Sequence, residues 1–307
     1  MPKDLHILPK LRDSLTFLYI EHCTIEQLNL SIVMITKSGQ TPIPIAAMTV
    51  LMIGPGVSIT HAAIKVINDC GCMAVWCGEN CARFYAFGAG ETRSSRNLLI
   101  QACLCMDKTK HLEVAKRMYL RRFPDMDCEG MNIQQLRGLE GIRVREAYKL
   151  ASKNSGIPWN GRSYKQTEWD ASDPVNRALS TANAILYSVC QAAVISLGYS
   201  TGLGFIHTGK MLSFIYDVAD LYKAETTIPV AFSAVKNNPN DIEHQVRSEC
   251  RQAFYSSKIL KRIPEDLAWV FDVDISTDEF DVSGAGELWN DQGDTIQGGT
   301  NYGVNSK

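Results

Sequence analysis

The sequence predicts an α+β protein, in which a β-rich N-terminal domain precedes an all-helical domain and a disordered tail. Three observations support this prediction. Residues 1–88 contain short runs of β-branched and aromatic residues, which favour strands. Residues 97–275 repeat their apolar positions with a helical period. Residues 276–307 are acidic and rich in glycine, which is typical of disorder, and the polar segment 89–96 is expected to link the two domains.

Six short segments of the first domain have the composition of strands. Val, Ile, Thr, Tyr and Phe dominate them, and these residues fit a pleated, half-buried surface. One helix is expected to interrupt them, because Ser58 or Thr60 can cap residues 62–68, whose apolar positions have helical spacing. The expected strands are residues 15–22, 31–36, 41–45, 50–53, 73–76 and 82–87.

Longer periodic segments follow the linker. Their apolar residues recur at intervals of three and four, which predicts helices with one buried face. The expected helices are residues 98–106, 112–122, 133–153, 174–197, 214–222 and 242–261.

Bulk composition is that of an ordinary globular protein. Of the 307 residues, 45% are hydrophobic and 21% are charged. No window approaches the unbroken apolar run that a membrane span requires, and the N-terminus lacks a signal-peptide core. The expected location is therefore the cytoplasm.

The net charge of −2 hides an uneven distribution. From residue 271 onward the chain has eight acidic residues and one basic residue. Residues 1–270 therefore have 30 basic against 25 acidic residues, a charge of about +5. A phosphate-binding surface on this part of the chain is permitted, although composition alone does not establish one.

Four of the ten cysteines lie close together in the sequence: Cys70, Cys72, Cys77 and Cys81. They could hold zinc as part of a regulator, but their spacings fit no standard zinc pattern. The interpretation that we favour is that these reduced thiols are small buried hydrophobic side chains. Disulfides are not expected in the cytoplasm.

Three carboxylates and one imidazole are the candidate chemical groups. Asp217 and Asp220 are three residues apart, so a helix projects both from nearly one face. His207 lies ten residues upstream, in a glycine-rich segment that can turn tightly. Glu140 lies on the predicted helix 133–153 between two glycines. If the four converge, they suit a hard divalent cation such as Mg²⁺ or Mn²⁺.

Each of these residues also has a purely structural interpretation. Glu140 taken alone is a solvated residue on a helix surface. A histidine among apolar residues is more often a hydrogen-bonded core residue, but the acidic pair that follows His207 and the nearby Lys210 favour a functional role. The two aspartates need a counter-ion on a half-buried face, which either a metal or Lys223 could supply.

Three motifs occur in a characteristic order: Arg-Gly-x-Glu-Gly at 137–141, Gly-Phe-x-His-Thr-Gly-Lys at 204–210 and Tyr-Asp-x-Ala-Asp at 216–220. Together they closely resemble the CRISPR-associated spacer-acquisition integrase and endonuclease, the universal adaptation subunit of CRISPR systems, and within it the type I-E branch. The resemblance extends over about residues 10–265. It implies a β-rich N-terminal domain and a helical catalytic domain, as expected above.

The resemblance implies a role for each candidate residue. Glu140, His207 and Asp220 are expected to coordinate Mg²⁺ or Mn²⁺, and Asp217 to support the site. The family forms homodimers, two of which flank a dimer of a small ferredoxin-like partner in a heterohexamer. The implied reaction, part of antiviral defence, is a transesterification in which the 3′-hydroxyl of captured DNA attacks a phosphodiester at the CRISPR repeat. It needs no ATP, in agreement with the absence of a G-x-x-x-x-G-K-[ST] loop.

The same resemblance implies contacts with double-stranded and branched DNA. Stacking of a base on an aromatic side chain contributes roughly 1–3 kcal/mol. The aromatic residues expected at the DNA end are Tyr164, Trp169 and Tyr187. Three further residues, two basic and one aromatic, are expected near the pocket for the protospacer-adjacent motif: Arg137, Lys210 and Tyr216. The arginines suited to the phosphate backbone are Arg83, Arg247 and Arg251. Core aromatics and solvated arginines are the alternative for each.

Two features depart from the family pattern. His22 stands where relatives have a tyrosine wedge at the duplex end, and the acidic tail lacks the expected proline-rich character. Two other functions stay open as well. One is a metal nuclease that acts on branched DNA in repair with the same four residues, and the other is a non-catalytic DNA-binding scaffold.

Overall fold

The computed structural model describes residues 15–78, 84–88, 95–123, 130–162 and 173–272, and two short strands beyond them. Residues 1–275 form one compact unit and residues 276–307 a second. In the second unit, β9 (Leu288–Trp289) pairs antiparallel with β10 (Thr295–Ile296). The rest of the predicted tail and most of the predicted linker lie outside the described residues. The first unit begins with strands and ends with helices, which confirms the predicted α+β class.

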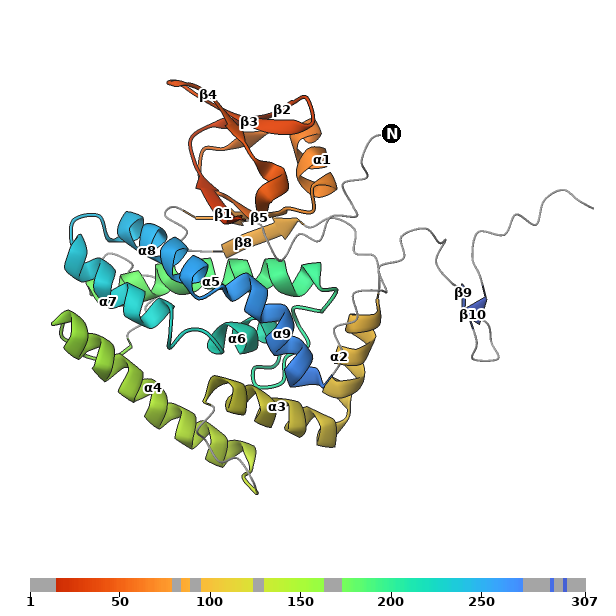
Figure 1. The fold of residues 1–307 in the computed structure, drawn as a ribbon, viewed down its shortest axis with the longest axis vertical. Coiled ribbons are helices and arrows are strands. Elements are labelled where there is room, and N and C mark those ends of the chain that lie inside the picture. The colour runs from red at the N-terminus through yellow and green to blue at the C-terminus, as the bar shows by residue number, and fades with distance from the viewer. Residues whose placement is uncertain are drawn as a thin grey trace, which may run out of the picture. The chain divides into compact units, whose positions relative to one another are not determined.

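Two four-stranded sheets form the N-terminal part of the first unit (Figure 1). In one, with the order β1-β5-β7-β8, the first three strands are parallel and β8 is antiparallel to β7. In the other, with the order β4-β3-β2-β6, only the β2–β6 pair is parallel. The strands are β1 (Leu15–Ile20), β2 (Thr24–Leu28), β3 (Ser31–Thr36), β4 (Gly39–Ile43), β5 (Met48–Ile53), β6 (Ser58–Ile59), β7 (Met73–Cys77) and β8 (Phe84–Gly88).

Strand β5 is buried on both faces, which explains the apolar run at residues 50–53. Successive side chains of a strand point to opposite faces. Val50 and Met52 therefore join the core shared with the helices, whereas Leu51 and Ile53 join the core between the two sheets. This sheet thus links the β-rich part to the helical part.

Helix α1 (His61–Asp69) covers the core between the two sheets, and its N-terminal cap is one of the two predicted residues. The Thr60 side chain caps it by accepting the Ala63 N–H at 3.3 Å. Its buried residues Ala63 and Ile67 pack into the core between the sheets. A single turn of 3₁₀ helix, η2 (Ile45–Ala47), precedes β5.

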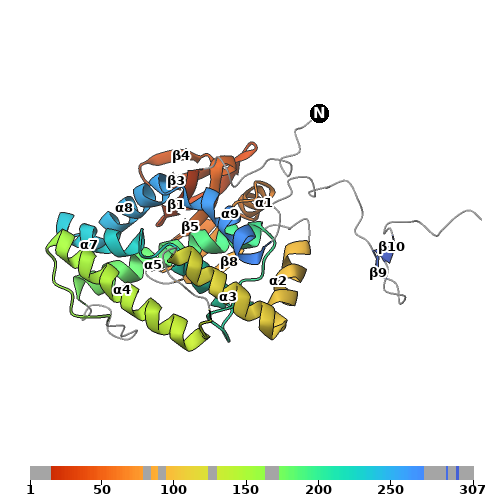
Figure 2. The ribbon, with the colours of Figure 1, turned by 60° about the horizontal axis from the view of Figure 1, so that its bottom comes forward.

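The helical part is built around α5, which contacts strand β5 and helices α6 to α9. Figure 2 shows α3 and α4 side by side, in agreement with their packing. The helices are α2 (Arg96–Met106), α3 (Lys108–Arg122), α4 (Ile133–Ser155), α5 (Pro174–Ser196), α6 (Ser213–Asp220), α7 (Thr227–Asn237), α8 (Ile242–Ser256) and α9 (Ile259–Phe271).

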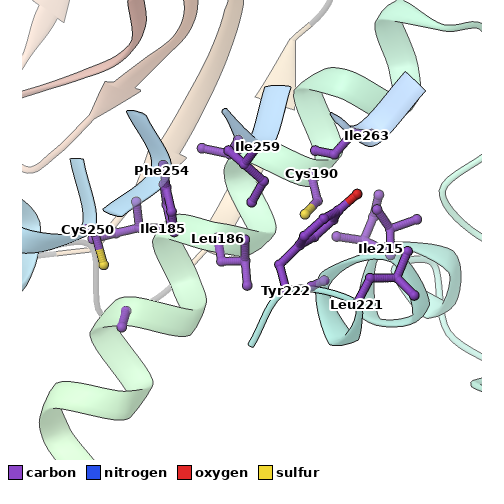
Figure 3. Close-up of a cluster of buried hydrophobic side chains, with 14 of the residues drawn as sticks. Ile185, Leu186, Cys190, Ile215, Leu221, Tyr222, Cys250, Phe254, Ile259 and Ile263 are labelled. Atoms are coloured by element: carbon purple, nitrogen blue, oxygen red, sulfur yellow. The ribbon is translucent and has the colours of Figure 1, made fainter. Parts of the chain in front are cut away.

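Helix α5 supplies the centre of the hydrophobic core. Figure 3 shows Leu186 and Cys190 of α5 among side chains from α6, α8 and α9, with the Tyr222 ring beside them. By length and composition, residues 174–195 could also cross a membrane, which the sequence had not suggested. Because 72% of the most apolar window is buried by other elements, as in the core helix of a globular protein, this is weak evidence for a membrane span.

The predicted helices differ from the structure at two places. The helix expected over residues 242–261 is two helices, because Lys258 adopts a left-handed backbone (φ 51°) between α8 and α9. The apolar period continues across this break because both helices bury a face against α5.

Helix α7 was not predicted at all. Its residues are apolar on nearly every side, so they lack amphipathic contrast, and Pro229 is tolerated only because it lies in the first turn.

Candidate active site

Helix α2 holds the segment that carries His207, residues 197–212. Gln101 is fully buried and donates from Nε2 to the carbonyl oxygens of Ser200 at 3.0 Å and Leu203 at 2.9 Å. Its Oε1 accepts the N–H of Ser200 at 2.7 Å. One amide side chain thus forms hydrogen bonds with three backbone groups that lie outside any helix or strand. These bonds fix the path of the segment.

Glycine at position 204 is required by space. A Cβ there would collide with the carbonyl oxygen of His207 and lie 3.0 Å from Asp217 Oδ2. The next peptide is braced from α3, where Nε2 of His111 lies 2.8 Å from the carbonyl oxygen of Phe205. The segment can therefore fold closely over Asp217.

Asp217 joins this segment to α6 and is only 1% exposed. Its Oδ2 accepts the N–H groups of Phe205 at 2.6 Å and Ile206 at 3.1 Å. Its Oδ1 accepts the N–H of His207 at 2.8 Å and lies 2.7 Å from Nδ1 of the same residue. Both oxygens are engaged by these four groups, so Asp217 is placed to position His207.

The imidazole of His207 is oriented for a ligand. With Nδ1 directed at Asp217, Nε2 is the nitrogen that stays available, an arrangement common in metal-binding histidines. The side chain is 44% exposed. The hydrogen bond to Asp217 raises the pKa of His207 and outweighs burial, which lowers it, and the nearby Asp220 raises this pKa further.

Glu140 and Asp220 share a cation. Nη1 of Arg122, the last residue of α3, pairs with Glu140 Oε1 and lies 3.7 Å from Asp220 Oδ2. Lys223 Nζ lies 2.6 Å from Asp220 Oδ1. Burial raises the pKa of Asp220, but Lys223 and Arg122 together hold it below its usual value. Glu140, with a 21% exposed side chain, is thus a paired and not a solvated residue.

The four candidate residues form two pairs. His207 is paired with Asp217, and Glu140 is joined to Asp220 through Arg122. Among the described residues, no three His, Cys, Asp or Glu side chains are gathered closely enough to hold a metal ion as they stand. Their chemistry nevertheless fits Mg²⁺ or Mn²⁺, with two carboxylates and an imidazole backed by a third carboxylate. A guanidinium nitrogen already lies between Glu140 and Asp220. In the described part of the chain, one buried atom at this site, Nε of Arg122, also lacks a hydrogen-bond partner.

Aromatic rings connect the two pairs. Tyr216 packs edge-on against His207, with ring centroids 5.8 Å apart, and against Tyr187 at 5.0 Å. The Tyr187 hydroxyl accepts a hydrogen bond from Lys223 at 2.8 Å, and Lys223 also pairs with Asp220. A continuous run of contacts therefore leads from His207 to Asp220.

The remaining predicted DNA contacts are spread over the surface. Arg137 and Lys210 are exposed near His207, and Arg137 donates to the carbonyl oxygen of Ile206 at 3.4 Å. Arg251 is exposed on α8. Arg247 lies 5.1 Å above the Tyr19 ring and lines a groove of 520 Å³ between α8 and the β-rich part. The exposed His22 also lies in that part, whereas three residues fall outside the described ranges: Arg83, Tyr164 and Trp169.

The cysteines show no sign of a zinc centre in the described part of the chain. Cys70 and Cys72 are buried in the core between the sheets, and Cys77 is buried in the core next to the helices. None of the three forms a disulfide with another described residue. Cys81 lies outside the described residues. The interpretation as small hydrophobic side chains agrees with these positions.

Residue-by-residue reading of the sequence missed several residues of the site. Arg122 follows another arginine at a helix end, Gln101 lies in a short helix, and His111 lies in a polar one. Their partners are distant in the sequence, up to 102 residues away for Gln101. Gln101 is the single buried residue of the described helix α2, and only the structure shows that burial.

Comparison with known proteins identifies the family. Residues 119–263 match the family model of CRISPR associated protein Cas1. The CRISPR-associated endonuclease Cas1 2 of Thermus thermophilus is 44% identical over 306 residues, which covers 98% of this chain and 94% of that protein. The CRISPR-associated endonuclease Cas1 of Escherichia coli K12, a type I-E protein, is 38% identical over 254 residues, 82% of this chain and 83% of that protein.

A solved structure agrees with this match. The crystal structure of a TtCas1–DNA complex superimposes with a TM-score of 0.81 at 42% identity, covering 93% of this chain and all of that one (100%). The similarity therefore spans both the β-rich and the helical part, beyond the residues of the three motifs. The chain belongs to the Cas1 family of CRISPR-associated proteins.

Proposed function

We propose that this chain is a metal-dependent DNA endonuclease and integrase of CRISPR adaptation, which joins the 3′-hydroxyl of captured DNA to the CRISPR repeat. The observation that carries the proposal is the linked set of Glu140, Asp220 and the His207–Asp217 pair. Family membership supports it, because the relatives are named CRISPR-associated endonucleases.

The proposed metal ligands are Glu140, Asp220 and Nε2 of His207. Carboxylate oxygens and one imidazole suit Mg²⁺ or Mn²⁺. When bound, the metal supplies Lewis-acid stabilisation of the phosphoryl oxygens and lowers the pKa of the attacking hydroxyl. Asp217 holds the imidazole in the tautomer that presents Nε2.

The proposed reaction exchanges one phosphodiester for another. The 3′-oxygen of the captured DNA forms a bond to phosphorus at the repeat edge and loses its proton, while the bond to the leaving 3′-oxygen breaks and that oxygen takes up a proton. The partly buried ammonium of Lys223 adds positive charge beside Asp220, where negative charge grows on the phosphoryl oxygens. No bond energy from a nucleotide is consumed.

Binding of DNA is supported by the solved complex of a relative with DNA. In this chain, Tyr187 and Tyr216 offer aromatic surface next to His207, and the exposed side chains of Arg137 and Lys210 supply positive charge nearby. We further propose a cytoplasmic homodimer that assembles with a small ferredoxin-like partner into a heterohexamer.

A strand-joining assay tests the proposal. The protein, with and without the partner, is incubated with a duplex bearing 3′-hydroxyl ends, a plasmid that carries a repeat, and Mn²⁺. We expect joined product, and a loss of at least about 100-fold for Glu140→Gln and His207→Ala, since even outer-shell changes at metal sites cost 10–100-fold. Glu146→Gln is the matched control, because Glu146 is exposed on the same helix.

Each alternative has its own outcome. Absence of joined product from folded protein in every combination would overturn the integrase. Cleavage of branched DNA without the partner, and without joining, would indicate a repair nuclease. Joining that His207→Ala leaves intact would indicate that the chain is a scaffold and that another component performs the chemistry.

A further inference from the structure

Arg122 lies at the centre of the proposed metal site. Its side chain is only 7% exposed, and its Nη1 pairs with Glu140 and lies 3.7 Å from Asp220 Oδ2. One guanidinium nitrogen therefore stands between two of the carboxylates expected to bind the metal. That is the place that a cation shared by both carboxylates would occupy.

The charges at this position are already balanced without a metal. Glu140 and Asp220 bring two negative charges, and Arg122 and Lys223 bring two positive ones. A divalent cation added between the carboxylates would lie against the guanidinium in a largely buried site, where repulsion between like charges is weakly screened. Arg122 and the metal are therefore competitors for the same space.

The surroundings of Arg122 allow it to withdraw. Among the described residues, Glu140 is its one hydrogen-bond partner, and its Nε has none. The guanidinium lies 5.0 Å from the centroid of the Phe123 ring, a surface that attracts cations. Asp220 keeps its second cation, Lys223, if Arg122 moves.

We propose that Arg122 is an internal counter-ion, which holds Glu140 and Asp220 together in the metal-free protein and is displaced when the divalent metal binds. The inference rests on the proposed metal site and adds a residue that positions its ligands. Arg122 thereby weakens metal binding while it stabilises the empty site. A residue that only ties α3 to α4 would have no effect on metal affinity.

The test measures Mn²⁺ binding without DNA and without activity. Metal-free protein is titrated with Mn²⁺ while free Mn²⁺ is followed by electron paramagnetic resonance, and the unfolding midpoint is measured with and without Mn²⁺. For Arg122→Gln we expect a Kd at least about tenfold lower, which corresponds to about 1.4 kcal/mol. We also expect a lower midpoint in the metal-free state, which saturating Mn²⁺ raises more than in the wild type.

Arg143→Gln is the matched control. Arg143 lies 5.4 Å from the same Phe123 ring and carries the same charge, but among the described residues it makes no ion pair with Glu140 or Asp220. Its Kd for Mn²⁺ should equal that of the wild type. A general effect of net charge would instead appear in both variants.

Several outcomes would overturn the inference. One is an Arg122→Gln variant with an unchanged or higher Kd. Another is equal destabilisation with and without Mn²⁺, the result expected of a purely structural tie. If this variant does not fold, the proposal is tested by ¹⁵N NMR of the guanidinium groups in the wild type. Addition of Mg²⁺ should shift the Arg122 signals. An unshifted Arg122 signal would contradict displacement. Arg122→Lys assigns those signals.

A separate arm tests the metal site itself. Glu140→Gln should abolish the Mn²⁺ binding seen in the wild type. If wild-type binding does not depend on Glu140, the proposed metal site is refuted and the role of Arg122 with it. If it does depend on Glu140 but not on Arg122, only the inference about Arg122 fails.

Discussion

Replacing Asp217 with asparagine tests whether one carboxylate organises the His207 segment. The wild-type carboxylate is 1% exposed and receives the N–H groups of Phe205, Ile206 and His207, together with the His207 ring. An amide of the same size has one acceptor oxygen, and its NH₂ group turns toward two of these donors. Two hydrogen bonds to a buried charge are lost whichever way the amide faces.

The expected cost follows from these contacts. A hydrogen bond to a charged group contributes about 1.5–3 kcal/mol, so two of them contribute about 3–6 kcal/mol. Asp217→Asn should therefore lower the free energy of unfolding by about that amount. Because typical domains are stable by only about 5–15 kcal/mol, the change is large enough to measure with confidence by urea titration.

The histidine provides a second readout with a definite sign. The bond to Asp217 is the main cause of the raised pKa of His207, so this pKa should fall in the variant when it is followed by NMR in metal-free protein. A raised pKa stabilises the fold below the ordinary value and ceases to do so above the folded value. The stability gap between the two proteins should thus be larger below the ordinary histidine pKa of 6.5 than above the raised folded pKa of His207.

Asp266→Asn is the matched control. Asp266 is also 1% exposed, accepts the Tyr222 hydroxyl at 2.6 Å and Arg121 Nε at 2.7 Å, and lies on α9. This variant should lose stability while the pKa of His207 stays unchanged. A loss below about 1 kcal/mol for Asp217→Asn, or the same His207 shift in both variants, would refute the reasoning.

Two further predictions concern the helices that hold the segment. Gln101→Leu should lower the free energy of unfolding by about 2–4 kcal/mol and speed amide exchange in residues 200–207, because three backbone groups lose a partner; the exposed Gln134→Leu should do neither. Asp107 caps α3, and its bond to the Lys110 N–H lowers its pKa. Its charge stabilises the fold above its unfolded pKa of 3.8 and ceases to do so as the pH falls through the lower folded value. Asp107→Asn should therefore differ from the wild type in urea titrations at neutral pH and converge with it in acid.

Periodicity was enough for elements with one buried face. Strand β3 begins and ends at the predicted residues, and α1 has its predicted cap at Thr60. Periodicity failed where an element has no clear difference between a buried apolar face and an exposed polar face. Helix α7 is apolar on nearly all sides, and strand β2 is largely exposed. It also could not detect the break at Lys258, because a single left-handed residue leaves the apolar pattern of the flanking helices unchanged.

The candidate site was only partly accessible to residue-by-residue reasoning. The spacing of Asp217 and Asp220 placed both on α6, but it could not show that one carboxylate turns to His207 and the other to Lys223. The resemblance to a known family named Glu140 as their partner, whereas pattern alone favoured a solvated glutamate. The contacts of Arg122 with both Glu140 and Asp220 come from packing between α3, α4 and α6.

The sequence by itself determined the fold class, the family and the four candidate residues, because local periodicity and short motifs are properties of neighbouring positions. Only the tertiary structure decided which charges meet. Gln101 reaches a segment about one hundred residues away, and Arg122 stands between Glu140 and Asp220. Such contacts depend on how helices pack around α5, and packing is set by the whole buried surface. The counter-ion proposed for the metal site is therefore visible in the folded protein alone.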